Sequence, residues 1–272
     1  MHSGSEEEAR AALSMYRSSD AEVSKEIEEM SRNNNSTEGR KGAGFSDLFS
    51  SLYLRPFLCL VFMMLAQQST GFIAIATKSN DIFLKIKGPL NPGDSDQSID
   101  PAQLTISIAL LNILIGFLST FINKMFSRRP SYFVLSLLQV VILFALGMNL
   151  SPSKNLLSSP QIGIILMFLF QLNYNLGLGP LPFIYMGESL PSSIRSLVPP
   201  ILVTINGIAT GVMLQIFNSL IDAYGYDVIF FSLGFLTLVF FSLSFHLMDE
   251  TKGLSMNEVD EKYEKLRIKK SQ

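Results

Sequence analysis

Uncharged amide side chains are the most informative polar residues of this sequence, because they interrupt long apolar runs. Gln67, Gln68, Asn112 and Asn175 all lie inside such runs. An amide offers hydrogen-bond donors and an acceptor without requiring a counter-ion, so a set of amides suits a polyhydroxylated ligand such as a sugar. For any one amide, a hydrogen bond between packed membrane helices, worth about 0.6 kcal/mol, is the simpler explanation. For the set, which also includes Asn173, Asn206 and Gln215, a ligand cavity is the better explanation.

A cluster of helix-breaking residues follows the last of these amides. Gly177, Gly179, Pro180 and Pro182 stand within a long apolar run that extends to about Met186. Each proline removes a backbone donor and clashes one turn back, which frees carbonyl groups. In a membrane such carbonyls must face protein or a water-filled cavity, and broken helices at mid-membrane often form substrate sites. A kinked packing helix with glycines at a close contact remains an equally good explanation.

Charged residues suggest a second feature at the ends of the apolar runs. Glu188, Arg195 and Glu250 could pair across helices and hold one state of a gate closed. The simpler reading is that basic residues at membrane boundaries follow the positive-inside bias, which suffices for Arg128 and Arg129. No carboxylate lies at mid-depth, which favours passive over proton-coupled transport.

Other chemistries find little support. The sequence has no nucleotide-binding glycine loop, no Ser/His/Asp set and no CxxC pair, so we predict that the protein is not an enzyme and needs no cofactor. Two histidines without a carboxylate cluster predict no metal site. The net charge of -2 does not indicate a nucleic-acid partner.

The elements that must position the amides are membrane-spanning helices. The chain of 272 residues is 48% apolar and 16% charged, with its charges crowded at the two ends. This pattern predicts an all-α membrane protein whose partner is the lipid bilayer. Six spans of about 20 residues are expected, approximately Pro56–Lys78, Ala102–Lys124, Pro130–Leu150, Gln161–Met186, Leu197–Ile221 and Tyr226–Met248. The polar connection from Ser79 to Pro101 is expected to be a solvated loop.

The polar ends divide the chain into three parts and indicate its orientation. We expect a cytoplasmic segment at 1–54, with a helix from Ser5 to Met30, a membrane bundle at 55–248 and a cytoplasmic tail at 249–272. Six spans place both termini on one side. Of the 21 Lys and Arg residues, all but Lys78, Lys85, Lys87 and Lys154 fall on that side. The termini are therefore predicted to be cytoplasmic.

Several motifs in this order resemble those of the sugar porters of the major facilitator superfamily. They are Q-Q-S-T-G at 67–71, the pair Arg128-Arg129, G-L-G-P-L-P-F at 177–183, E-S-L-P-S-S-I-R at 188–195 and D-E-T-K-G at 249–253. The chain is most similar to the insect facilitated trehalose transporters, and it corresponds to the C-terminal six-helix half of the twelve-helix fold. The resemblance implies sugar contacts at Gln67, Gln68, Asn112, Asn175 and Phe183, and a cytoplasmic gate of Glu188, Arg195 and Glu250.

The sequence also departs from the family pattern. Ile73 stands where the family has a sugar-contacting asparagine, Asn175 where it has an acid, and Phe183 where it has a tryptophan. An aromatic pair of the family is replaced by Thr77-Lys78. These changes weaken the expectation of ordinary hexose affinity.

The resemblance implies facilitated diffusion of trehalose or a hexose by alternating access, in the plasma membrane. The family's cavity lies between two six-helix halves, so a half-length chain would require a second half or a homologue to cover it. One alternative is a truncated, vestigial or non-transporting protein that pairs with a full-length homologue. Another is a proton-coupled sugar symporter.

Overall fold

The computed structural model describes residues 24, 48–50, 52–87, 100–153, 157–250, 258–261, 263 and 265. Its contacts divide the chain into two compact units, Met1–Asp47 and Leu48–Gln272. The helix expected from Ser5 to Met30 lies outside the described residues, apart from Ser24. The second unit contains every helix discussed below.

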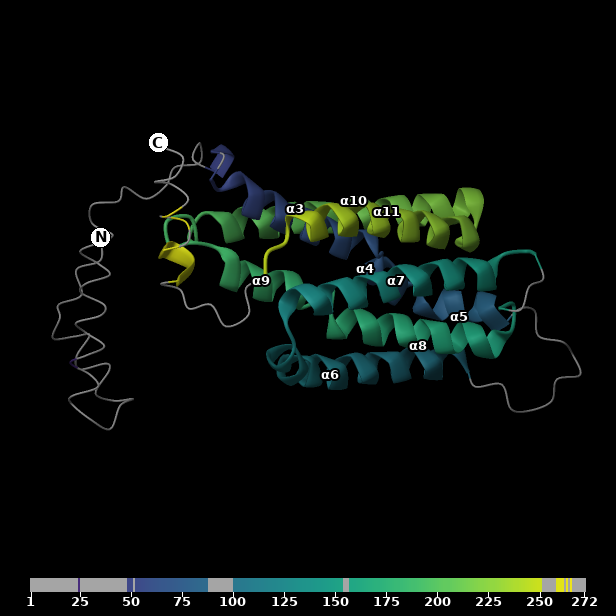
Figure 1. Cartoon of the computed structure of the whole chain (residues 1–272). Helices are drawn as coiled ribbons and strands as arrows, with labels where there is room; N and C mark the ends of the chain where they lie inside the picture. The colour runs from purple at the N-terminus through teal and green to yellow at the C-terminus, as the bar shows by residue number, and fades with distance from the viewer. Residues whose placement is uncertain are drawn as a thin grey trace, which may run out of the picture. The chain divides into compact units, whose positions relative to one another are not determined.

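Eight of the nine helices α3 to α11, as the described residues show them, form the six expected spans, and α5 lies between the first two spans (Figure 1). The nine helices are α3 (Leu54–Ser69), α4 (Phe72–Thr77), α5 (Ser79–Lys87), α6 (Pro101–Met125), α7 (Arg128–Leu150), α8 (Pro160–Leu176), α9 (Leu181–Ser189), α10 (Val198–Tyr224) and α11 (Tyr226–Leu247). Six helical segments are long and apolar enough to cross a membrane, which confirms the predicted number. Two of these segments are interrupted, because α3 continues into α4 and α8 continues into α9.

Local sequence explains where several of these helices begin and end. The carboxylate of Asp100 accepts a hydrogen bond from the backbone N–H of Ala102 at 3.1 Å, which caps the start of α6. Pro101 and Pro160 occupy the first turns of α6 and α8, where a missing N–H costs nothing. Gly225, with a φ of +87°, ends α10 and allows the chain to reverse into α11.

The expectation of a solvated loop from Ser79 to Pro101 was wrong for its first third. Ser79–Lys87 forms the helix α5, in which Ile82, Phe83 and Ile86 are buried. The three apolar residues recur at helical spacing, so they form one face that packs on α6 and α8. The polar residues between them lowered the average hydropathy and concealed this face. Residues 88–99 lie outside the described part.

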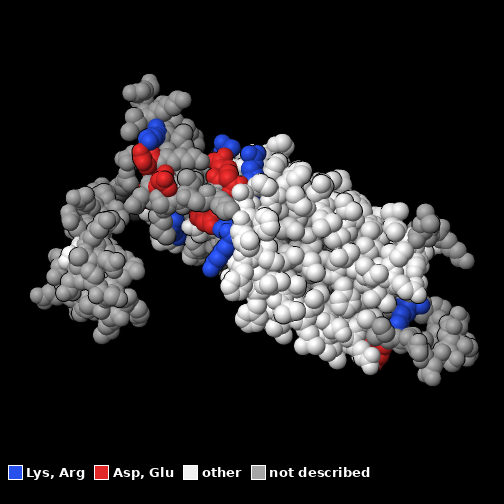
Figure 2. Space-filling view, turned by 60° about the horizontal axis from the view of Figure 1, so that its bottom comes forward, with Lys and Arg blue, Asp and Glu red and all other residues white. Residues whose placement is uncertain are grey.

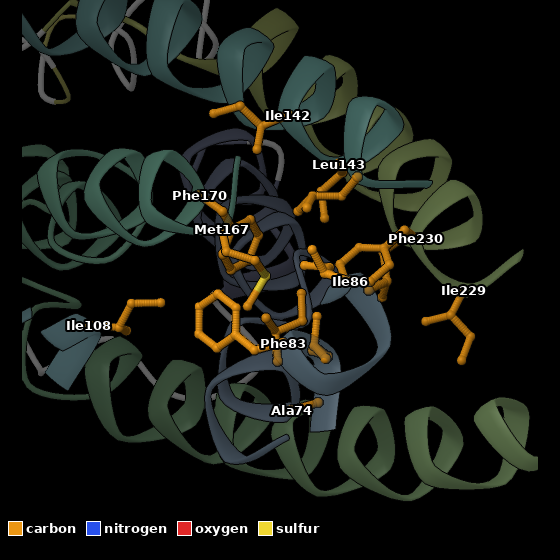
Figure 3. Packing of buried hydrophobic residues seen from close by; sticks show 14 of the residues in the cluster. Ala74, Phe83, Ile86, Ile108, Ile142, Leu143, Met167, Phe170, Ile229 and Phe230 are labelled. Carbon is orange, nitrogen blue, oxygen red and sulfur yellow. The ribbon is translucent and has the colours of Figure 1, made fainter. Parts of the chain in front are cut away.

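The core of the bundle is formed by residues of α4, α5, α6, α7, α8, α10 and α11 (Figure 3). Phe83, Met167, Phe170 and Phe230 converge there and are fully buried. The spans are buried to different extents. In the most apolar stretch of each span, 67% of the residues are buried in the first span, but only 17% in α6 and 11% in α10. Most of the surface of α6 and α10 therefore remains available to lipid or to another helical unit.

Charged residues of the described part lie towards the two ends of the bundle, with an uncharged belt between them on the face that Figure 2 shows. This distribution suits a bilayer, because a charged group at its centre is costly. It confirms an integral membrane protein with polar ends.

Candidate functional site

The first span is interrupted where the amide motif ends. Gly71 has a φ of +69°, a left-handed conformation that glycine adopts without strain, and it separates α3 from α4. The hydroxyl of Thr70 donates to the carbonyl of Gln67 at 2.7 Å, which satisfies one acceptor at this helix end. The ring of Phe72 then stacks on that of Tyr174 with centroids 3.7 Å apart. This stacking holds the break of the first span against the fourth span.

The fourth span is interrupted at the predicted position. Helix α8 ends at Leu176 and α9 begins at Leu181, so the break spans the glycine and proline cluster. Pro180 has no N–H to offer to the carbonyl of Leu176, and the side-chain amide of Asn123 donates to that carbonyl at 3.0 Å instead. The amide of Gln67 donates to the carbonyl of Gly179 at 2.8 Å. The exposed backbone groups of the break thus receive partners from other helices, as a break in a membrane requires.

A first amide group consists of Gln67, Gln68 and Asn206. The Nδ2 of Asn206 donates to the Oε1 of Gln67 at 2.8 Å, and the Nε2 of Gln68 donates to the Oδ1 of Asn206 at 2.9 Å. The two glutamines are only 4% and 8% exposed. This group joins α3 to α10 and, through Gly179, to the break in the fourth span.

A second amide group consists of Asn112, Gln171 and Asn175. The Nδ2 of Asn175 donates to the Oδ1 of Asn112 at 2.9 Å, and the Nδ2 of Asn112 donates to the Oε1 of Gln171 at 3.3 Å. The Nδ2 of Asn175 also reaches the carbonyl of Gln171 at 2.8 Å. This group joins α6 to the C-terminal end of α8, directly before the break.

The predicted amides are therefore gathered beside the broken spans, but their hydrogen bonds link them into two groups rather than one. Phe183 lies on α9 and is 42% exposed, outside both groups. Asn206 and Gln171 were not assigned to the site from the sequence. Asn206 had been noted as an intramembrane amide, and Gln171 precedes Asn175 by one helical turn, a spacing that could have identified it. In the structure Gln67, Gln68, Asn112 and Asn175 each have an interhelical partner, Asn173 likewise bonds to α7, and Gln215 is exposed. A ligand role for these residues stays a prediction.

The charged residues at one end of the bundle form the second feature of the site. The sequence suggested Arg195 as the partner of Glu188, but the residue that pairs with Glu188 is Arg128. Its guanidinium binds the carboxylate of Glu188, with Nη2 at 2.7 Å and Nε at 3.0 and 3.1 Å from the oxygens. Arg128 is 8% exposed and paired, so the positive-inside bias alone does not suffice to explain this residue. Two extended residues, Phe126 and Ser127, connect α6 to Arg128 at the start of α7.

Glu250 belongs to the same cluster but acts on the backbone. Its carboxylate oxygens accept hydrogen bonds from the N–H groups of Arg128 and Arg129, both at 3.1 Å. This is a helix cap supplied by a residue more than 120 positions away in sequence, and a carboxylate is stabilised at a helix N-terminus.

Arg195 donates to the carbonyls of Gly187 and Leu190 at 3.2 and 2.9 Å, at the end of α9. The three predicted gate residues thus lie at one end of the bundle, and their gating role stays a prediction.

Spans broken beside buried amides, with an ion-pair cluster at one end of the bundle, are typical of membrane transporters. A family model described as "Sugar (and other) transporter" matches residues 1–263. The chain belongs to this sugar transporter family.

Known proteins resemble the chain over almost its whole length. The facilitated trehalose transporter Tret1 of Bombyx mori is 26% identical over 265 residues, which cover 94% of this chain and 50% of the relative. Tret1 of Apis mellifera ligustica is 25% identical, with 96% of this chain and 51% of the relative covered. Tret1 of Aedes aegypti is 24% identical and only 32% of it is covered. The chain therefore spans about half or less of the length of these relatives.

A solved structure confirms the fold. The proton:xylose symporter XylE of the major facilitator superfamily, bound to 6-bromo-6-deoxy-D-glucose, superposes with a TM-score of 0.70 and 16% identity. The match covers 94% of this chain and 52% of the symporter. The six spans thus have the arrangement of about half of a major facilitator fold, as predicted.

Proposed function

We propose that the protein transports a sugar, trehalose or a hexose, across the membrane by facilitated diffusion. The observation that carries this proposal is that two partly buried amide groups lie beside the breaks of the first and fourth spans. Amides of this kind suit hydroxyl groups, and broken spans are where transporters of this architecture bind substrate. The trehalose transporters among the relatives support the choice of substrate class. Sugar contacts are proposed at Gln67, Gln68, Asn112, Asn175 and Phe183.

The cavity would be completed by a second six-helix unit, either another half of the same assembly or a homologue. The largely exposed α6 and α10 support this proposal, as does the greater length of the relatives. Transport would then proceed by rocking of the two units about the site. The cluster of Arg128 with Glu188, together with Arg195 and Glu250, would close the cytoplasmic side in one of the two states. The plasma membrane is the proposed location, with both termini cytoplasmic.

Uptake measurements test the proposed activity. Vesicles that contain the full chain, alone or co-expressed with the N-terminal six-helix half of a relative, are expected to equilibrate radiolabelled trehalose or D-glucose faster than vesicles without it. Passive diffusion predicts the same initial rate with and without a pH gradient. Dependence on an inward proton gradient would identify a symporter instead. No uptake in either assembly would favour the non-transporting alternative.

The orientation makes a separate prediction. A single cysteine introduced at Ser271, in a chain whose Cys59 is replaced by serine, should resist a membrane-impermeant thiol reagent on intact cells. A cysteine introduced at Ser98, in the connection before α6, should react under the same conditions. Permeabilised cells should label both positions, which controls for expression. Labelling of Ser271→Cys from outside would reverse the proposed topology.

A further inference from the structure

Gln67 and Gln68 of the first amide group share one partner, Asn206 on α10. We propose that Asn206 is a built-in competitor for the sugar, which displaces it from Gln67 and Gln68 on binding. This inference rests on the proposed function and adds to it a residue that determines affinity. Asn206 thereby couples occupancy of the site to the position of α10.

The hydrogen bonds assign this role to Asn206. Its Nδ2 occupies the Oε1 of Gln67 at 2.8 Å, and its Oδ1 occupies the Nε2 of Gln68 at 2.9 Å. The remaining amide nitrogen of Gln67 is bound to the carbonyl of Gly179 at 2.8 Å. One side chain thus presents a donor to one glutamine and an acceptor to the other. A sugar hydroxyl is also both a donor and an acceptor, so it can replace Asn206 at both positions.

Burial favours the exchange. Gln67 and Gln68 are 4% and 8% exposed, and a buried amide that loses its partner is strongly disfavoured. Each amide oxygen can accept two hydrogen bonds and each amide nitrogen can donate two, so it is the burial of the two glutamines, rather than a full set of bonds, that favours replacement of Asn206 over addition beside it. The sugar then takes over the acceptor of Gln67 and the donor of Gln68 as Asn206 leaves them.

The helix that carries Asn206 is the least buried of the six spans. Only 11% of the most apolar stretch of α10 is buried, the lowest share among the six spans. A Cβ added at Gly207 or Gly211, close to Asn206 on the same helix, would meet no atom within 4 Å. Within the described residues, α10 is therefore held mainly by its other face, which packs on α3, α4 and α11. Release of Asn206 removes two of the hydrogen bonds that hold α10 to α3.

Equilibrium binding of radiolabelled trehalose and D-glucose tests the proposal, using the full chain in the membrane assembly that binds sugar. One hydrogen bond of this kind changes an equilibrium constant by roughly 2- to 13-fold. Asn206→Leu, which leaves both glutamines without their competitor, is expected to tighten binding by at least about threefold. Asn206→Ser, which is too short to reach both glutamines, should act in the same direction if the leucine variant fails to assemble.

Two comparisons separate competition from a structural effect. Asn218→Leu makes the same change at an exposed position of α10 and should leave the affinity unchanged. In a Gln68→Leu background the gain from Asn206→Leu should shrink, because one of the two exchanged bonds is already absent. Unchanged or weaker binding in both Asn206→Leu and Asn206→Ser would overturn the inference. Absence of sugar binding by the unsubstituted assembly would instead refute the proposed function.

Discussion

Replacing Arg128 by leucine is expected to lower the free energy of unfolding by about 2–4 kcal/mol. The side chains of Arg128 and Glu188 are 10% and 28% exposed, and their charged atoms approach to 2.7 Å. Removing one member of a buried ion pair leaves the other charge without compensation, at a cost of about 3–5 kcal/mol. The partial exposure of Glu188 reduces the expected loss, because water can still reach its carboxylate.

The apparent melting temperature of the purified protein in detergent measures this loss. A fall of about 4–16 °C is expected, at about 2–4 °C for each kcal/mol in a chain of this size. Arg129→Leu is the matched control, since Arg129 is the exposed neighbour whose guanidinium lies 4.9 Å from the ring centre of Phe245. The Arg129→Leu substitution should lower the free energy of unfolding by no more than about 1 kcal/mol.

A double variant distinguishes the lost pair from lost packing. Arg128→Leu combined with Glu188→Leu removes both charges, so it should be more stable than Arg128→Leu alone. If the double variant melts no higher than the single one, the uncompensated charge of Glu188 is not the cause of the loss. If the double variant is stable, its sugar uptake tests the proposed gate. The gate predicts that transport is altered when the pair of Arg128 and Glu188 is absent.

Replacing Gly71 by alanine is expected to lower the free energy of unfolding by about 2–4 kcal/mol. The φ of +69° costs an alanine about 1–2 kcal/mol. In addition, the new Cβ would lie 2.8 Å from the Cδ1 of Leu233 on α11, and overpacking of this kind costs about 1–3 kcal/mol. Movement of the Leu233 side chain keeps the sum towards the lower part of the range.

The same melting measurement checks this prediction, with Gly116→Ala as the control. A Cβ at Gly116 would meet nothing within 4 Å, and alanine is the better residue within a helix such as α6. That variant should be neutral or more stable by up to about 1 kcal/mol. Gly71→Ala with Leu233→Ala should remain less stable than Leu233→Ala alone, because the backbone strain persists. A wild-type melting temperature for Gly71→Ala would show that the break does not depend on the left-handed conformation.

Local chemistry explains why much of the fold was predictable. About 20 consecutive apolar residues form a helix in a bilayer, whatever lies next to them, so the six spans were evident. The break before Leu181 followed from Pro180 and Pro182, which act on their own helix turn. The amides were recognisable because polar residues are rare in such runs. Each of these inferences needs only residues within one or two helical turns.

Tertiary structure alone decided which residues are partners. Arg128 meets Glu188 across 60 positions, and Glu250 caps α7 across more than 120, because the helix ends that carry them pack together. The choice of Asn206 as the partner of both glutamines depends in the same way on how α10 lies against α3. In a helical bundle, several side chains could make the same hydrogen bond to a given amide or guanidinium. The packing of whole helices selects among them, and that packing is a property of the complete assembly of spans rather than of any one stretch of sequence.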